Sequence, residues 1–188
     1  MKNIAIFASG SGTNYEAIME HVESGDIKAN VVLMATDHED AYVVTRAKNH
    51  NTPIFVINYK GRKKEEYEAE LVAKLKELKV DLIVLAGYMR FCGKVLLDAY
   101  EGYIINIHPA LLPAFKGAHG IEDAYNYGVK VFGVTVHYVD SGMDSGKIID
   151  KEAFHIEDGM NVDEVEARIH EIEHVLYPNV VRKLVRGD

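Results

Sequence analysis

The chain has few of the features that build disulfide frameworks or membrane proteins. Its 188 residues include one cysteine, Cys92, and no tryptophan. A single cysteine excludes an internal disulfide and a multi-cysteine metal site, so we interpret Cys92 as a free structural thiol. The longest apolar stretch, 82–89, is well short of the ~20 residues that a membrane span needs. No signal-peptide pattern opens the chain. We therefore predict a cytoplasmic protein with no membrane partner.

Basic residues are also scarce. The 21 Lys and Arg residues are outnumbered by 29 Asp and Glu residues, and the formal net charge is −8. Such a charge repels a nucleic-acid backbone, so we expect no nucleic-acid partner. The length and the 48% hydrophobic content suit one globular domain, and neither a repeat nor a linker interrupts the pattern. We predict a single domain over residues 1–188.

Short apolar runs alternate with amphipathic segments from the first residue onward. That alternation is typical of an α/β protein with a mostly parallel sheet. The strand candidates are almost continuously apolar, as strands buried on both faces are: Ile4–Ala8, Val31–Ala35, Ile54–Ile57, Leu82–Ala86 and Ile104–Ile107. Helical spacing relates Tyr67, Leu71, Leu75 and Leu78, and also Val43 and Ala47. We predict an open, mostly parallel twisted sheet with helices on both faces.

The last third of the chain has a different pattern. Only a glycine-rich stretch separates the strand candidates Val131–Tyr138 and Lys147–Phe154, which predicts adjacent strands with at least one antiparallel. Asn161 and Glu164 resemble a capping box at the start of a final helix. Pro178 is expected to bend or interrupt that helix.

A glycine-rich loop, Ser9-Gly10-Ser11-Gly12-Thr13-Asn14, follows the first strand. It leads into a helix expected from about Tyr15 to Glu23, where backbone N–H groups and the positive helix end favour an anion. A dinucleotide fingerprint would need glycine at Tyr15, and no Gly-Lys-Ser/Thr sequence is present. The loop is either a tight turn or a phosphate site, and its hydroxyl and amide donors favour a monophosphate.

Asn106 and His108 end the fifth strand. They are two residues apart, so their side chains share one face of the sheet. Pro109 stops the strand and leaves both at its carboxyl end, where ligands bind in open α/β sheets. An amide can stabilise an oxyanion, and an imidazole can move a proton near neutral pH. This pair is the predicted catalytic centre.

A catalytic histidine needs a carboxylate to hold its tautomer. Asp144, in the glycine-rich loop after residues 131–138, is the predicted partner, and Asp140 is the competing candidate. Single histidines elsewhere are more often structural than catalytic, so we interpret His119, His137 and His155 as structural.

Several ordered motifs resemble those of one enzyme family. They are Ser9–Asn14, Leu85-Ala86-Gly87-Tyr88-Met89-Arg90, Asn106-Ile107-His108-Pro109-Ala110-Leu111-Leu112-Pro113, Gly133–Val139 through Asp144, and Glu173-His174-Val175-Leu176-Tyr177-Pro178. In this order and over nearly the whole chain, they are similar to the phosphoribosylglycinamide formyltransferases.

The resemblance implies transfer of a formyl group from 10-formyltetrahydrofolate to the amine of glycinamide ribonucleotide in purine synthesis. It implies that Asn106 and His108 polarise the formyl oxygen, while Asp144 supports the histidine and a bound water. The folate is a co-substrate, and no metal is required. The resemblance leaves open whether the protein is a monomer or a homodimer.

The resemblance also implies two binding regions. The ribonucleotide phosphate would be held by Gly12, Thr13 and Asn14, and the ribose hydroxyls by Glu173. The folate would contact Lys64, Met89, Arg90, Phe91, Cys92, Asn106, Asp140, Ser141, Gly142, Met143 and Asp144. Three lysines depart from the family pattern on the folate side: Lys64, Lys147 and Lys151.

Two other activities compete with this interpretation. A formyltetrahydrofolate hydrolase would share the Asn-x-His-Pro pair but use water as the acceptor. A zinc peptidase would use His170, Glu171 and His174, which match the H-E-x-x-H pattern. No third zinc ligand is evident, and the predicted catalytic edge of the sheet lies elsewhere in the sequence.

Overall fold

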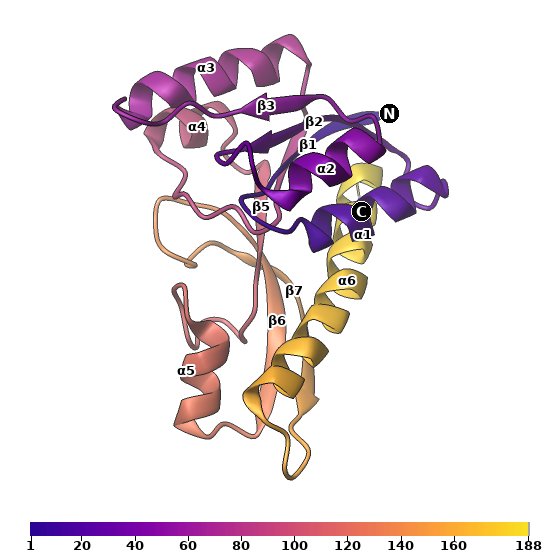
Figure 1. The fold of residues 1–188 in the computed structure, drawn as a ribbon, viewed down its shortest axis with the longest axis vertical. Coiled ribbons are helices and arrows are strands. Elements are labelled where there is room, and N and C mark those ends of the chain that lie inside the picture. The colour runs from indigo at the N-terminus through magenta and orange to yellow at the C-terminus, as the bar shows by residue number, and fades with distance from the viewer. Residues whose placement is uncertain (188) are drawn as a thin grey trace.

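The computed structural model describes residues 1–187, which form one seven-stranded sheet with helices packed around it (Figure 1). The strands are β1 (Lys2–Phe7), β2 (Ala29–Thr36), β3 (Ile54–Val56), β4 (Leu82–Leu85), β5 (Ile104–His108), β6 (Val131–Tyr138) and β7 (Ile148–His155). The helices are α1 (Thr13–Glu23), α2 (Tyr42–Asn49), α3 (Lys64–Glu77), α4 (Lys94–Ala99), α5 (Gly120–Tyr127) and α6 (Val162–Arg186).

The sheet has the strand order β3-β2-β1-β4-β5-β6-β7. Strands β1 to β5 pair in parallel, and β6 runs antiparallel to both β5 and β7. The prediction of a mostly parallel sheet with one antiparallel strand in the last third is confirmed. Because β1 lies next to β4, and β4 next to β5, the loops at their carboxyl ends are neighbours along one edge.

Alternate residues of the central strands face two separate cores. Ile4 and Ile6 of β1 pack with the buried residues of α1 and α6, whereas Ala5 and Phe7 pack with those of α3 and α4. Helices therefore cover both faces, as the continuous apolar runs predicted. Figure 1 shows α6 as one long helix that passes α1 and continues alongside β6 and β7.

Helix α6 differs from its prediction at Pro178. Interruption was one of the two outcomes expected there, but the helix continues to Arg186. Pro178 is buried against the core, and the hydroxyl of the preceding Tyr177 donates to Leu85 O at 2.6 Å. Tertiary contacts on both sides of the proline thus compensate for the missing N–H group. The capping prediction holds in part, because Asn161 Oδ1 accepts from Glu164 N at 2.9 Å.

Two element boundaries also differ from the expected ones. Helix α1 begins at Thr13 rather than near Tyr15, because Gly12 takes a left-handed conformation that serves as its N-cap. Strand β7 is displaced by one residue from the expected 147–154. No helix within residues 1–187 is both long and apolar enough to cross a membrane.

Candidate active site

The glycine-rich loop turns sharply from β1 into α1. Gly12 has a φ of 77°, and a Cβ atom there would lie 2.5 Å from Val43 Cγ2, so the position needs glycine for two reasons. The first bond of α1 runs from Glu16 N to Gly12 O at 2.9 Å. The N–H groups of Thr13 and Asn14 therefore precede the first hydrogen bond of the helix and are available to an anion.

Helix α6 brings a carboxylate to the same place. Glu173 is buried at 6% exposure, and Asn14 Nδ2 lies 3.5 Å from its Oε2. The other oxygen, Oε1, lies 2.6 Å from His170 Nδ1. Hydrogen bonding to Glu173 raises the pKa of His170, despite an opposing effect of burial. Asn14 Oδ1 is buried without a hydrogen-bond partner. Residues that are 159 positions apart in the chain thus form one polar cluster, which the sequence predicted only through resemblance.

Asn106 and His108 lie at the carboxyl end of β5, as predicted. Their side chains project on the side of α3 and α4, because Ile105 and Ile107 face the other core. His108 is 4% exposed, and its Nε2 lies 2.8 Å from Phe115 O. Since a carbonyl oxygen only accepts, Nε2 carries the proton of the neutral ring. The unprotonated nitrogen is then Nδ1.

Asp144, rather than Asp140, faces this nitrogen. Its Oδ2 lies 3.6 Å from His108 Nδ1 and accepts a hydrogen bond from Gly117 N at 2.8 Å. Asp144 has a φ of 50°, a left-handed conformation in which Asp is one of the better tolerated residues. Asp140 Oδ1 instead accepts from Ser145 Oγ and Gly142 N within its own loop. These bonds, led by that of Ser145, lower the pKa of Asp140.

His137 is the residue at this site that sequence reasoning missed. It lies directly opposite Asn106 in the antiparallel β5–β6 pair, so the two share a face of the sheet. Its Nε2 is 3.8 Å from Asp144 Oδ1. Knowing the register of β6 against β5 would have indicated it, but the sequence does not reveal that register. The other two histidines interpreted as structural, His119 and His155, are exposed.

Thr135 orders the loop that follows β5. It lies opposite His108, its hydroxyl donates to Ala110 O at 2.7 Å, and it accepts from Leu112 N at 3.1 Å. Thr135 is completely buried. These two bonds hold the turn after Pro109 against β6 and so fix where β5 ends.

Most residues predicted for the folate side lie on two loops, whereas Lys64 begins α3 and Asn106 lies in β5. A cavity of about 340 Å³ is lined by Asp37, His38, Lys64, Met89, Arg90 and Phe91. Lys64 Nζ donates to Phe91 O at 2.9 Å, so this lysine secures the loop after β4. Met89 and Phe91 are 73% and 65% exposed, which leaves apolar surface available for an aromatic ligand. Burial raises the pKa of the Cys92 thiol to about 12.

The other loop predicted for the folate side is also exposed. Ser141, Gly142 and Met143 lie in the loop between β6 and β7. Lys147 is exposed, and Lys151 Nζ donates to Leu112 O, which ties β7 to the loop after β5.

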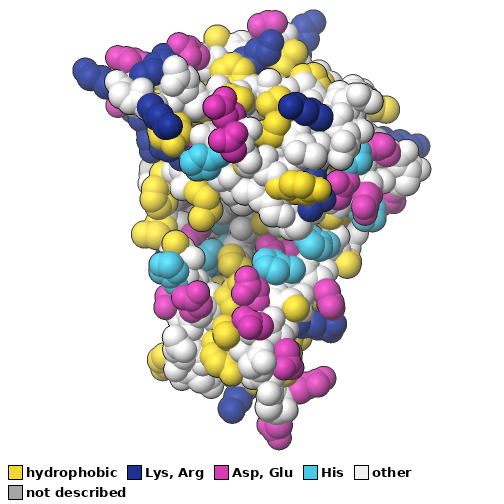
Figure 2. Space-filling view, viewed as in Figure 1, with side chains coloured by type: hydrophobic (Ala, Val, Ile, Leu, Met, Phe, Trp, Pro, Cys, Tyr) yellow, Lys and Arg dark blue, Asp and Glu magenta, His cyan; other side chains and the backbone are white. Residues whose placement is uncertain are grey.

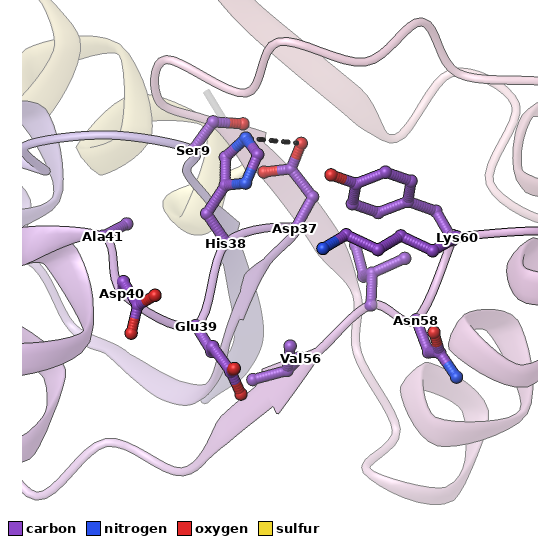
Figure 3. A pocket seen from close by; sticks show the side chains of 11 residues that line it. Ser9, Asp37, His38, Glu39, Asp40, Ala41, Val56, Asn58 and Lys60 are labelled. Carbon is purple, nitrogen blue, oxygen red and sulfur yellow. Dashed lines mark ion pairs between the residues drawn. The ribbon is translucent and has the colours of Figure 1, made fainter.

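A second cavity, of about 650 Å³, adjoins the first at Asp37 and His38 (Figure 3). It lies at the ends of β2 and β3 and is lined by Ser9, Glu39 and Lys60 among others. It does not include Asn106, His108 or Asp144. The pair Arg90 Nε and Asp37 Oδ2, at 3.0 Å, stands beside both cavities, and the Arg90 guanidinium lies 3.3 Å from the centre of the Tyr59 ring.

The H-E-x-x-H segment has contacts that do not suit a zinc peptidase. His170 Nδ1 is hydrogen-bonded to Glu173. The catalytic base in that interpretation, Glu171, instead lies 3.3 Å from Arg168 Nη1 on the exposed face of α6. Within residues 1–187, no group of three or more His, Cys, Asp or Glu side chains is placed to hold a metal ion.

The two polar clusters lie along the same edge of the sheet, at the carboxyl ends of β1 and β5, with β4 between these strands. Figure 2 shows a hollow in the middle of one face of the molecule, with several histidine side chains around it. The loop after β1 supplies free backbone N–H groups with Glu173 beside them, and β5 supplies an amide and an imidazole that faces Asp144. The arrangement can bind a phosphate and stabilise charge at an acyl carbon nearby.

Known proteins match this chain over almost its whole length. Residues 2–181 match the model of a family described as formyl transferase. A phosphoribosylglycinamide formyltransferase from Bacillus subtilis is 44% identical to this chain. The alignment covers 98% of this chain and 95% of that protein. A solved phosphoribosylglycinamide formyltransferase from Bacillus halodurans has a TM-score of 0.94 and 51% identity, with 98% of this chain and 95% of that chain covered. A glycinamide ribonucleotide transformylase from Geobacillus kaustophilus has a TM-score of 0.95 and 49% identity, with 98% of each chain covered.

Proposed function

The chain belongs to the formyl transferase family, and we propose that it transfers a formyl group from 10-formyltetrahydrofolate to the amine of glycinamide ribonucleotide. Relatives bearing that activity in their names match the chain from end to end at 44% to 51% identity. The observation that carries the proposal is the meeting of Asn106, His108 and Asp144 beside an anion site at one sheet edge. A soluble purine enzyme of this kind works in the cytoplasm.

The phosphate of the ribonucleotide binds at the start of α1. Gly12 allows the backbone to approach closely, and the free N–H groups of Thr13 and Asn14 donate to phosphate oxygens. The helix dipole favours the negative charge there. Glu173 accepts hydrogen bonds from the ribose hydroxyls, and its bond to His170 holds the carboxylate in place.

The amine of the ribonucleotide attacks the formyl carbon, and the carbonyl oxygen becomes an oxyanion. Asn106 donates its amide hydrogen to this oxygen. The bond to Phe115 O keeps the His108 proton on Nε2, so Nδ1 takes up the proton that the attacking amine releases and, as part of an imidazolium, donates it to the oxyanion as a hydrogen bond. Asp144, 3.6 Å from Nδ1, stabilises that positive charge.

Collapse of the tetrahedral intermediate breaks the bond between the formyl carbon and the folate nitrogen. The amine proton must leave and the folate nitrogen must gain one, so the reaction moves protons without a net change. Asp144 and a bound water lie between the two nitrogens in this scheme. The amide product and tetrahydrofolate then leave.

The folate lies against the loop after β4 and the loop between β6 and β7. Met89 and Phe91 offer exposed apolar surface, and the adjacent Cys92 packs against the core. Lys64 and Arg90 place two positive charges at the same cavity, which suits the acidic tail of the co-substrate. On the other side, the backbone of 140–144 carries the polar contacts to the pterin.

A spectrophotometric assay of tetrahydrofolate release tests the proposal. Release is expected only when glycinamide ribonucleotide is present. Release at the same rate without the ribonucleotide would identify a formyltetrahydrofolate hydrolase. No release in either condition, with a folded protein that still binds the ribonucleotide, would remove formyl transfer from the account.

A further inference from the structure

His137 is buried at the centre of the site, yet only one of its ring nitrogens has a hydrogen-bond partner. The residue is 2% exposed, and its Nδ1 lies 2.9 Å from Tyr138 O. Because that carbonyl only accepts, Nδ1 carries the ring proton. The other nitrogen, Nε2, is then an acceptor, and it is buried without a partner.

The unprotonated Nε2 of His137 faces the one oxygen of Asp144 that has no hydrogen bond. Nε2 lies 3.8 Å from Oδ1, whereas Oδ2 accepts from Gly117 N and faces His108 Nδ1. The carboxylate therefore stands between two imidazoles, and each presents an unprotonated nitrogen to it.

Burial and the neighbouring groups together lower the pKa of the His137 ring. Burial lowers the pKa of His137, and so does the neighbouring His108, while Tyr138 O, Asp144 and Asp140 oppose the shift. The net effect keeps His137 neutral near pH 7. His137 Nε2 therefore stays an acceptor.

We propose that His137 is a positioning residue for formyl transfer, whose Nε2 and Asp144 Oδ1 together hold one water molecule by accepting its two O–H groups. A separation of 3.8 Å between two acceptors suits a single bridging donor molecule. The bridge fixes the orientation of the carboxylate toward His108 and places the water through which protons pass. This inference rests on the proposed function.

The alternative is a purely structural histidine that ties β6 to its own backbone. Only Nδ1 takes part in that bond, so the two roles belong to different atoms of the ring. Asparagine places its amide nitrogen near the Nδ1 position and has nothing at Nε2. Glutamine reaches the Nε2 position with a polar group. The variants His137→Asn and His137→Gln therefore separate the roles.

Steady-state kinetics on the two variants provide the first test. We expect His137→Asn to lower kcat about tenfold, the effect of one lost hydrogen bond, with both KM values within about twofold of the wild type. His137→Gln should recover most of that loss. A His137→Asn enzyme as active as the wild type would overturn the proposal. Equal losses of kcat in both variants, each accompanied by a lowered Tm, would also overturn it, because they would indicate a purely structural role.

Nitrogen-15 NMR of the histidine rings tests the same geometry without turnover. His137 should show a protonated Nδ1 and an unprotonated Nε2 between pH 6 and 8, and Asp144→Asn should shift the Nε2 signal. A proton on Nε2 at pH 7, or a signal indifferent to Asp144→Asn, would contradict the proposal. A wild type that shows this tautomer but no ribonucleotide-dependent release would mean that the proposed function has failed, not the geometry.

Discussion

Replacing Gly12 with alanine tests the packing that shapes the proposed phosphate site. The added Cβ would lie 2.5 Å from Val43 Cγ2 and 3.1 Å from Val43 Cα, at a φ of 77°. A left-handed residue with a side chain costs ~1–2 kcal/mol, and overpacking a well-filled site costs ~1–3 kcal/mol. We therefore expect Gly12→Ala to lower the free energy of unfolding by about 2–5 kcal/mol, and to weaken ribonucleotide binding.

Two matched glycines isolate the two contributions in urea denaturation. Gly25 has a φ of 85° with nothing within 4 Å of an added Cβ, so Gly25→Ala should show the backbone cost alone. Gly10 lies outside the left-handed region in open space, so Gly10→Ala should change stability by less than about 0.5 kcal/mol. If Gly12→Ala lowered the free energy of unfolding by no more than Gly25→Ala does, that result would show that the contact with Val43 is not what excludes a side chain at Gly12.

Three further predictions concern other groups. His50 contacts Glu16 and Glu23, and although burial alone would lower its pKa, these bonds raise it above 6.5. The stability it contributes is present below pH 6.5 and lost as pH rises through the folded pKa, so the stability difference between wild type and His50→Gln should shrink from pH 6 to pH 9. Asp144→Asn should lower kcat by more than it weakens ribonucleotide binding measured by calorimetry, and equal effects would remove Asp144 from proton transfer. The Cys92 thiol, with a pKa of about 12, should react with iodoacetamide at pH 8 far more slowly than free cysteine, and a comparable rate would contradict its burial.

The apolar pattern predicted most of the sheet because the parallel strands are buried on both faces. Ile4, Ile83 and Ile104 lie in short, almost continuously apolar runs, which are typical of strands buried on both faces. The helix start at Thr13 was missed because it depends on the conformation of Gly12, which contacts Val43, 31 positions further along the chain. Local sequence does not contain that contact.

The final helix shows how tertiary contacts override a local rule. A proline in a helix interior removes a backbone hydrogen bond, so a bend or an interruption at Pro178 was the expectation from sequence. The buried Tyr177 hydroxyl donates to Leu85 O and lies 3.3 Å from Ile105 O, which fixes α6 against β4 and β5 at the same turn. Nothing in the residues next to Pro178 reveals this anchor.

At the site, too, some features follow from local sequence and others depend on tertiary contacts. The two-residue spacing of Asn106 and His108 in a strand predicted their shared face, and the structure confirms it. The choice of Asp144 over Asp140 required the path of the loop after β6, and the choice of His137 required the strand register. Both depend on contacts between β5 and β6 that composition and periodicity do not specify.

Tracing the transferred carbon tests the central claim most directly. The enzyme would be supplied with 10-formyltetrahydrofolate labelled with carbon-13 in the formyl group, together with glycinamide ribonucleotide, and the products followed by NMR. The account predicts that the label appears in a formamide on the ribonucleotide, in an amount equal to the tetrahydrofolate released. Label recovered as formate, with the ribonucleotide unchanged, would contradict it.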